Sequence, residues 1–177
     1  MTEKISSWNV GKVKITRIVE IERTGPMFVV PDAIPENIIK MPWLKPYFAD
    51  EKGNTIVSVH ALVIETSEKC IIVDTCLGND KERHILAWNN LQTKFLEDLE
   101  RAGYKTTDID TVLCTHLHTD HVGWNTVLIN DKWEPTFKKA DYLFGKDEWN
   151  YTEKQIKIPA YAEFINCLLY TSDAADE

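Results

Sequence analysis

Three of the five histidines in this 177-residue chain lie within six positions of one another, together with one aspartate. The candidate ligands in this stretch, residues 115–121, are His116, His118, Asp120 and His121. Imidazole and carboxylate are the usual ligands of zinc and of related transition metals. A single ion rarely needs four ligands this close together in sequence, whereas a pair of ions does. The residue types therefore predict a site for two metal ions.

An apolar segment, residues 110–114 (DTVLC), precedes the histidines and is typical of a buried strand. Side chains at positions i and i+2 of an extended backbone point to the same side. His116 and His118 can therefore converge on one ion. Asp120 and His121 follow where the chain turns away from the strand, so they can point at a second ion beside the first.

Two other interpretations of the histidine cluster are weaker. Simple packing does not explain three histidines and an aspartate after an apolar strand, because burying them without partners would be costly. A purely structural zinc site usually contains cysteine pairs with C-x₂₋₄-C spacing. Cys114 alone does not supply such a pair.

Two motifs in the chain resemble those of a known family. Residues 115–123, THLHTDHVG, resemble the H-x-H-x-D-H signature of the metallo-β-lactamase superfamily of hydrolases. Residues 70–75, CIIVDT, resemble the family's earlier strand that ends in an aspartate, the VDTG motif, although two residues intervene before Gly78. The resemblance extends from Val13 to the mid-160s and is specific for the superfamily rather than for a substrate.

The resemblance implies an α/β fold, the metallo-β-lactamase-like αββα sandwich, truncated here to roughly its first half plus part of the second. It implies that His116 and His118 hold one metal ion and that Asp120 and His121 hold the other. Asp74 would orient the ligand loop without binding a metal itself. Two zinc ions are expected in the intact protein, with iron or manganese as alternatives.

Further ligands in the family, two histidines and a bridging aspartate, lie after the motif. This chain has no histidine after His121, and the two others, His60 and His84, precede the motif. We interpret them as packed and exposed residues, respectively. We therefore expect an incomplete domain at residues 1–166. Residues 167–177 (CLLYTSDAADE) match the translation of a transposase sequencing adapter and are interpreted as an artefactual tail.

The reaction implied for the intact protein is hydrolysis of a small ester, lactone or phosphoester by a metal-activated water. Asp120 would also pass a proton to the leaving group. The HVGW ending of the motif favours the lactonase and organophosphate-hydrolase branches. One alternative is redox chemistry on iron held by the same ligands, and another is a non-catalytic metal-binding fragment. We expect the truncated chain to have little activity.

The composition excludes several classes of protein. A hydrophobic content of 44% and a charged content of 27% suit one globular domain. The net charge of −8 argues against a nucleic-acid partner. We find no apolar run of about 18 residues, no signal sequence and no disulfide framework. We therefore expect a cytoplasmic protein that binds a small-molecule substrate, without a membrane partner.

Hydrophobic periodicity predicts the elements that position the motif. Strands are expected at 13–21, 55–65, 69–74 and 140–144. The spacing of apolar residues predicts a helix within 79–103, and its charged residues at 94, 97, 98, 100 and 101 are expected to form a solvated face. A short helix is expected after residue 122, the start of another helix at 145–151, and an apolar segment at 160–169. Five prolines in residues 24–54 predict a long ordered loop, which could be a plain flap, a pocket wall or a homodimer contact.

Overall fold

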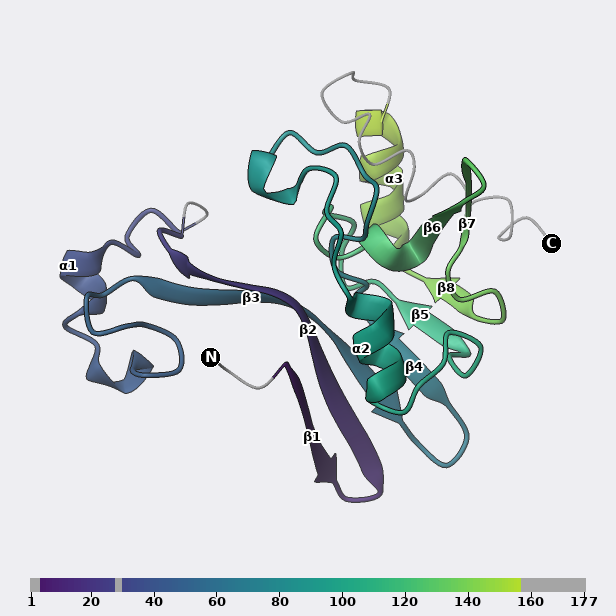
Figure 1. The fold of residues 1–177 in the computed structure, drawn as a ribbon, viewed down its shortest axis with the longest axis horizontal. Coiled ribbons are helices and arrows are strands. Elements are labelled where there is room, and N and C mark those ends of the chain that lie inside the picture. The colour runs from purple at the N-terminus through teal and green to yellow at the C-terminus, as the bar shows by residue number, and fades with distance from the viewer. Residues whose placement is uncertain (1–3, 28–29, 157–177) are drawn as a thin grey trace. The chain divides into compact units, whose positions relative to one another are not determined.

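The computed structural model describes residues 4–27 and 30–156 (Figure 1). These residues form two compact units. One unit is Ile21–Val59, and the other combines Lys4–Glu20 with the chain from His60 onward. Each unit is described by itself below.

The unit of residues 21–59 contains the proline-rich segment. Its helices are short, α1 (Pro35–Ile38) and the 3₁₀ turn η1 (Pro42–Leu44), and each begins with a proline. Proline suits the first position of a helix because its fixed φ is already helical and its missing N–H is not needed there. The prediction of a long ordered loop is confirmed, and the loop contains these two short helical turns. Three aromatic side chains of this unit are exposed: Trp43, Tyr47 and Phe48.

A six-stranded sheet has the strand order β1-β2-β3-β4-β5-β8. Strands β1 (Ile5–Val10) and β2 (Val13–Gly25) pair antiparallel, as do β3 (Thr55–Glu65) and β4 (Cys70–Val73). Strand β5 (Thr111–Leu113) pairs parallel with β4 and with β8 (Asp141–Leu143). Because β4 and β5 are parallel, both motifs leave the sheet at the same edge, where α/β folds place their chemistry.

One face of this sheet forms the core of the larger unit. The paired residues Val63, Ile72 and Val112 are fully buried. Helix α2 (Phe95–Arg101; Figure 1) also has two fully buried side chains, Phe95 and Leu99. Apolar burial of this kind contributes most of the folding free energy.

The helix predicted within residues 79–103 is shorter than its apolar spacing indicates. It begins only at Phe95, and Leu91 lies before it in an irregular segment with the 3₁₀ turn η2 (Leu86–Trp88). The assignment of Asp98 to a solvated face was wrong. Asp98 is buried because Arg101 (2.9 Å) and Lys4 (3.8 Å) pair with its carboxylate.

Two antiparallel pairings were not predicted from the sequence, β1 with β2 and the hairpin of β6 (Thr126–Ile129) with β7 (Lys132–Pro135). The hairpin turns at Asn130 and Asp131, both with positive φ, as a type I′ turn requires. The short helix expected after residue 122 is present as the 3₁₀ turn η3 (Gly123–Asn125), and the helix expected to start within 145–151 is α3 (Lys146–Ile156).

The predicted apolar segment at 160–169 and the tail at 167–177 lie outside the described residues. Within residues 4–27 and 30–156, no helix has the length and apolar character needed to cross a membrane. The cellular compartment stays a prediction.

Candidate metal centre

The loop that follows β5 brings the three motif histidines together. The ring centroids of His116 and His121 are 3.8 Å apart, and those of His116 and His118 are 4.7 Å apart. His118 is exposed, whereas the other two rings are half-buried. Burial, together with the neighbouring imidazoles, lowers the pKa of His116, which keeps its ring neutral and able to bind a metal.

Two carboxylates flank the ring of His121. Its Nδ1 atom lies 2.8 Å from Asp74 Oδ2, and its Nε2 atom lies 3.5 Å from Asp120 Oδ2. Burial by itself would lower the pKa of His121, but the two carboxylates outweigh burial and raise it to about 9. The same contacts lower the pKa of both aspartates against the opposing effect of burial. In the absence of a metal, the imidazolium therefore links the two carboxylates.

Asp74 lies directly after β4 with a φ of 56°, a conformation that aspartate tolerates better than most residues. Its carboxylate accepts hydrogen bonds from the main-chain N–H of Thr115 (2.8 Å) and from the Thr115 hydroxyl. It thus contacts both ends of the ligand loop, at Thr115 and at His121. The role of Thr115 was not predicted, although its place directly before the first motif histidine was a signal.

The loop is also held by a close approach of two backbones. The N–H of Thr75 donates to the carbonyl of His121 (2.7 Å), and the N–H of Gly123 donates to the carbonyl of Cys76 (2.7 Å). A Cβ atom at Gly123 would overlap the main-chain carbonyl of Leu77, and one at Gly78 would lie 2.5 Å from the Gly123 carbonyl oxygen. Only glycine fits at these two positions.

A buried carboxylate, that of Glu20, bonds to both of the segments that meet at Gly78 and Gly123. Glu20 accepts hydrogen bonds from Leu77 N (2.7 Å), Trp124 Nε1 (2.7 Å) and Thr93 Oγ1 (2.9 Å). Burial raises the pKa of Glu20 against the effect of these donors. Trp124 is buried and stacks on Phe95, with 5.8 Å between the ring centroids.

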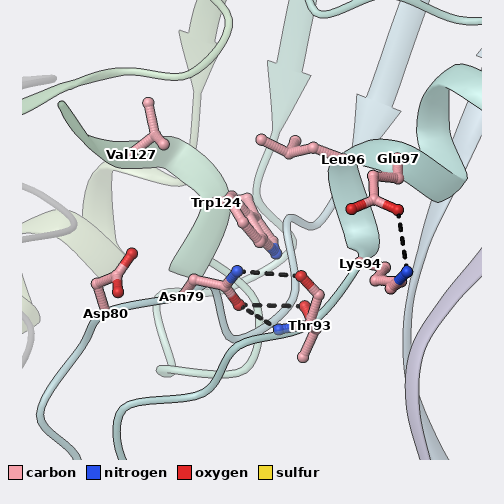
Figure 2. Close-up of a pocket in the computed structure, with 8 residues that line it drawn as sticks. All are labelled: Asn79, Asp80, Thr93, Lys94, Leu96, Glu97, Trp124 and Val127. Atoms are coloured by element: carbon pink, nitrogen blue, oxygen red, sulfur yellow. Dashed lines mark hydrogen bonds and ion pairs between the residues drawn. The ribbon is translucent and has the colours of Figure 1, made fainter.

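A hollow of about 270 Å³ lies beside α2, and Trp124 is among the residues that line it (Figure 2). A hydrogen-bonded pair, Asn79 and Thr93, spans one wall, and the Lys94–Glu97 ion pair lies on the other. None of the motif residues lines this hollow. It is therefore separate from the candidate metal centre.

The imidazole and carboxylate groups of the loop are suitable zinc ligands, but the described residues do not supply a complete set of ligands for an ion. The 3.5 Å between His121 Nε2 and Asp120 Oδ2 suits two ligands of one tetrahedral ion with bonds of about 2.0 Å. Among the described residues, however, no group of three or more His, Cys, Asp or Glu side chains is placed to hold an ion together. The loop therefore offers pairs of donors.

Comparison with known proteins identifies the family. A family model described as the metallo-beta-lactamase superfamily matches residues 54–160 of the chain. The chain belongs to the metallo-β-lactamase superfamily. Curated superfamily relatives from Mycobacterium bovis and Mycobacterium tuberculosis, each named a "Probable metallo-hydrolase", are 32% identical over 74 residues. The match covers 36% of this chain and 24% of each relative, so the chain aligns with about a quarter of their length.

Solved structures of the superfamily share this fold. A crystal structure titled hydrolase AbOPH in the beta lactamase superfamily has a TM-score of 0.70 at 18% identity, over 99% of this chain and 60% of that one. AidC, titled a dizinc quorum-quenching lactonase, has a TM-score of 0.70 at 17% identity, over 96% and 59%. A structure titled a probable metal-dependent hydrolase from Staphylococcus aureus has a TM-score of 0.60 at 24% identity, over 83% of this chain and 52% of that one. The predicted metallo-β-lactamase-like α/β fold is thus confirmed.

Proposed function

We propose that this chain carries part of the metal centre of a hydrolase that acts on a small ester, lactone or phosphoester. His116 and His118 would bind one ion, and Asp120 and His121 would bind the other. The observation that carries the proposal is the placement of His121, whose Nε2 faces Asp120 while its Nδ1 contacts Asp74. A ligand imidazole held by a carboxylate on its second nitrogen is the usual arrangement in metal sites.

The bound ions would lower the pKa of a water molecule toward 7, so that hydroxide is available as a nucleophile near neutral pH. Asp120, half-buried beside His121, is the candidate for moving a proton to the leaving group. Zinc is the proposed metal because the donors are imidazoles and carboxylates and because the similar fold of AidC is titled dizinc. A lactone is proposed as one class of substrate because AidC is titled a lactonase.

Metal analysis of the 177-residue chain tests this proposal. We expect bound zinc after purification and dialysis, and we expect His116→Ala combined with His118→Ala to remove at least half of it, because imidazole donors of one ion are lost. His84→Ala is the matched control, since His84 is an exposed histidine outside the motif. Zinc content unchanged in the double variant would refute the assignment.

Activity assays on lactones, aryl esters and phosphotriesters form a second test. We expect turnover by this chain at least ~100-fold below that of an intact metallo-hydrolase, because only donor pairs are present among the described residues. Iron in place of zinc, with turnover of a redox substrate, would favour the iron alternative. Rapid hydrolysis by the chain would show that these donors suffice.

A further inference from the structure

A carboxylate from helix α3 contacts the middle of the ligand loop. Glu148 Oε1 accepts a hydrogen bond of 3.0 Å from the main-chain N–H of Leu117. Leu117 lies between His116 and His118, and its side chain is buried. We propose that Glu148 is a positioning residue of the metal centre, whose carboxylate fixes the peptide between these two histidines and thereby the direction of both rings.

Among the described residues, Asp74 makes no hydrogen bond to the peptide at Leu117, between His116 and His118. Asp74 contacts Thr115 and His121, at the two ends of the loop. The peptide between the first two histidines is held instead from α3. Bends at His116 and His118 flank Leu117, and a peptide in such a loop can rotate about its neighbouring bonds and carry both side chains with it. A fixed N–H at Leu117 therefore restricts both rings. The two carboxylates therefore act on different segments of the same loop.

Helix α3 is well placed to hold the loop because it follows the strand beside β5. Strand β8 pairs with β5, and the N–H of Cys114 donates to the Leu143 carbonyl (2.8 Å). Phe144 and Trp149 pack with their centroids 5.2 Å apart across the start of the helix. Glu148 is thus carried on an element that is fixed to the strand from which the ligand loop leaves.

A simpler explanation of Glu148 is its place in the first turn of α3, where acidic residues stabilise the positive end of a helix. A carboxylate in this turn often bonds to the N–H at the start of its own helix. Glu148 bonds instead to a residue 31 positions away. Its neighbour Asp147 is also in the first turn and is exposed, so it serves as a matched control for the helix effect.

The role of Glu148 depends on the proposed metal function, so the test measures metal binding directly. Co²⁺ is added to the metal-free 177-residue chain, and its affinity and visible absorption spectrum are recorded for wild type, Glu148→Ala, Glu148→Gln and Asp147→Ala. We expect Glu148→Ala to weaken Co²⁺ binding by ~10-fold or more and to alter the spectrum, as loss of a ligand-orienting group does. Glu148→Gln keeps an acceptor oxygen and should restore most of the affinity.

Hydrogen exchange of the loop without metal gives a second measurement. Peptides covering residues 115–121 should exchange faster in Glu148→Ala than in wild type or Asp147→Ala, because Leu117 N–H loses its acceptor. Equal Co²⁺ affinity in wild type and Glu148→Ala would refute the role of Glu148 alone. An equal loss in Asp147→Ala, or no rescue by Glu148→Gln, would also refute it. A wild-type chain that binds no Co²⁺ would refute both this role and the proposed function.

Discussion

At the scale of single residues, Asp74 shows how one side chain can organise a site. Its carboxylate contacts Thr115 and His121, which lie six positions apart in the ligand loop. Its backbone has a positive φ of 56°, so a substitution by alanine would add backbone strain to the loss of the carboxylate. Asparagine tolerates this φ and has nearly the same shape. Asp74→Asn therefore isolates the effect of the charge.

We expect Asp74→Asn to lower the pKa of His121 from its value of about 9, because one of its two carboxylate partners is neutralised. The folded-state pKa of His121 lies above its ordinary value of 6.5. Its contribution to the stability of the metal-free protein is therefore full below pH 6.5 and is lost as the pH rises through about 9.

Urea unfolding of the metal-free wild type should accordingly show a fall in stability between pH 6.5 and 9.5, and in Asp74→Asn this fall should be smaller. At pH 6.5 the variant should be roughly 1–2 kcal/mol less stable than wild type, since the lost hydrogen bond is charge-assisted and partly exposed. An NMR titration of His121 checks the pKa itself. An unchanged titration would contradict the assigned pairing.

At the scale of elements, the position of the ligand loop depends on two segments that cross with almost no space between them. The turn after β4 and the end of the histidine motif meet at Gly78 and Gly123, where main-chain atoms occupy the place of any Cβ. Glu20 anchors both segments, through the N–H of Leu77 and the indole of Trp124. Close packing at the glycines and the buried carboxylate thus fix the distance between Asp74 and the histidines.

Gly123→Ala should therefore destabilise the protein by about 2–4 kcal/mol, because the added methyl overlaps the backbone at Leu77 and the segments must separate. The matched control is Gly25→Ala, since Gly25 has open space around its Cβ position and no positive φ. Urea unfolding and zinc content measure both variants. Equal stability of the two variants would show that the crossing can relax without loss.

At the scale of the whole chain, residues 4–27 and 30–156 leave one apolar face of the sheet covered and the other uncovered. The row Leu62, Val73, Leu113 and Leu143 runs across four paired strands, on the face opposite Val112. Leu113 and Leu143 are 39% and 50% exposed, whereas Val112 is fully buried. Apolar patches of this kind usually mark an interaction surface. In the sandwich expected from the family resemblance, a second sheet covers this face.

The uncovered row predicts that the 177-residue chain binds the apolar dye ANS and tends to associate. Leu113→Thr with Leu143→Thr should lower ANS fluorescence at least by about half while changing stability by less than about 1 kcal/mol, because both side chains are largely exposed. Val112→Thr, on the covered face, should instead lose about 1–3 kcal/mol. ANS titration and urea unfolding measure these effects. Unchanged dye binding in the double variant would place the exposed apolar surface elsewhere.

The sequence by itself determined the local patterns. The spacing of His116 and His118, the carboxylate after β4 and the Val- and Ile-rich run that predicts β3 all depend on neighbours within a few residues. The two-residue period of strands, the 3.6-residue period of helices and the closeness of imidazole and carboxylate groups in the motif are all properties of short stretches of chain. The family followed from the same stretches, because its two motifs are each shorter than ten residues.

The tertiary structure decided the contacts between distant segments. Glu148 lies 31 residues from Leu117, and Glu20 lies 104 residues from Trp124, so no spacing rule could pair them. The second ion pair of the buried Asp98, with Lys4 at 3.8 Å, likewise joins residues far apart in the chain, whereas its pair with Arg101 is local. The start of α2 was also misplaced, because Leu91 fits the helical period but lies in a segment held by side-chain hydrogen bonds such as Asn79 to Thr93. Periodicity describes which residues are apolar, whereas packing decides which segments are helical.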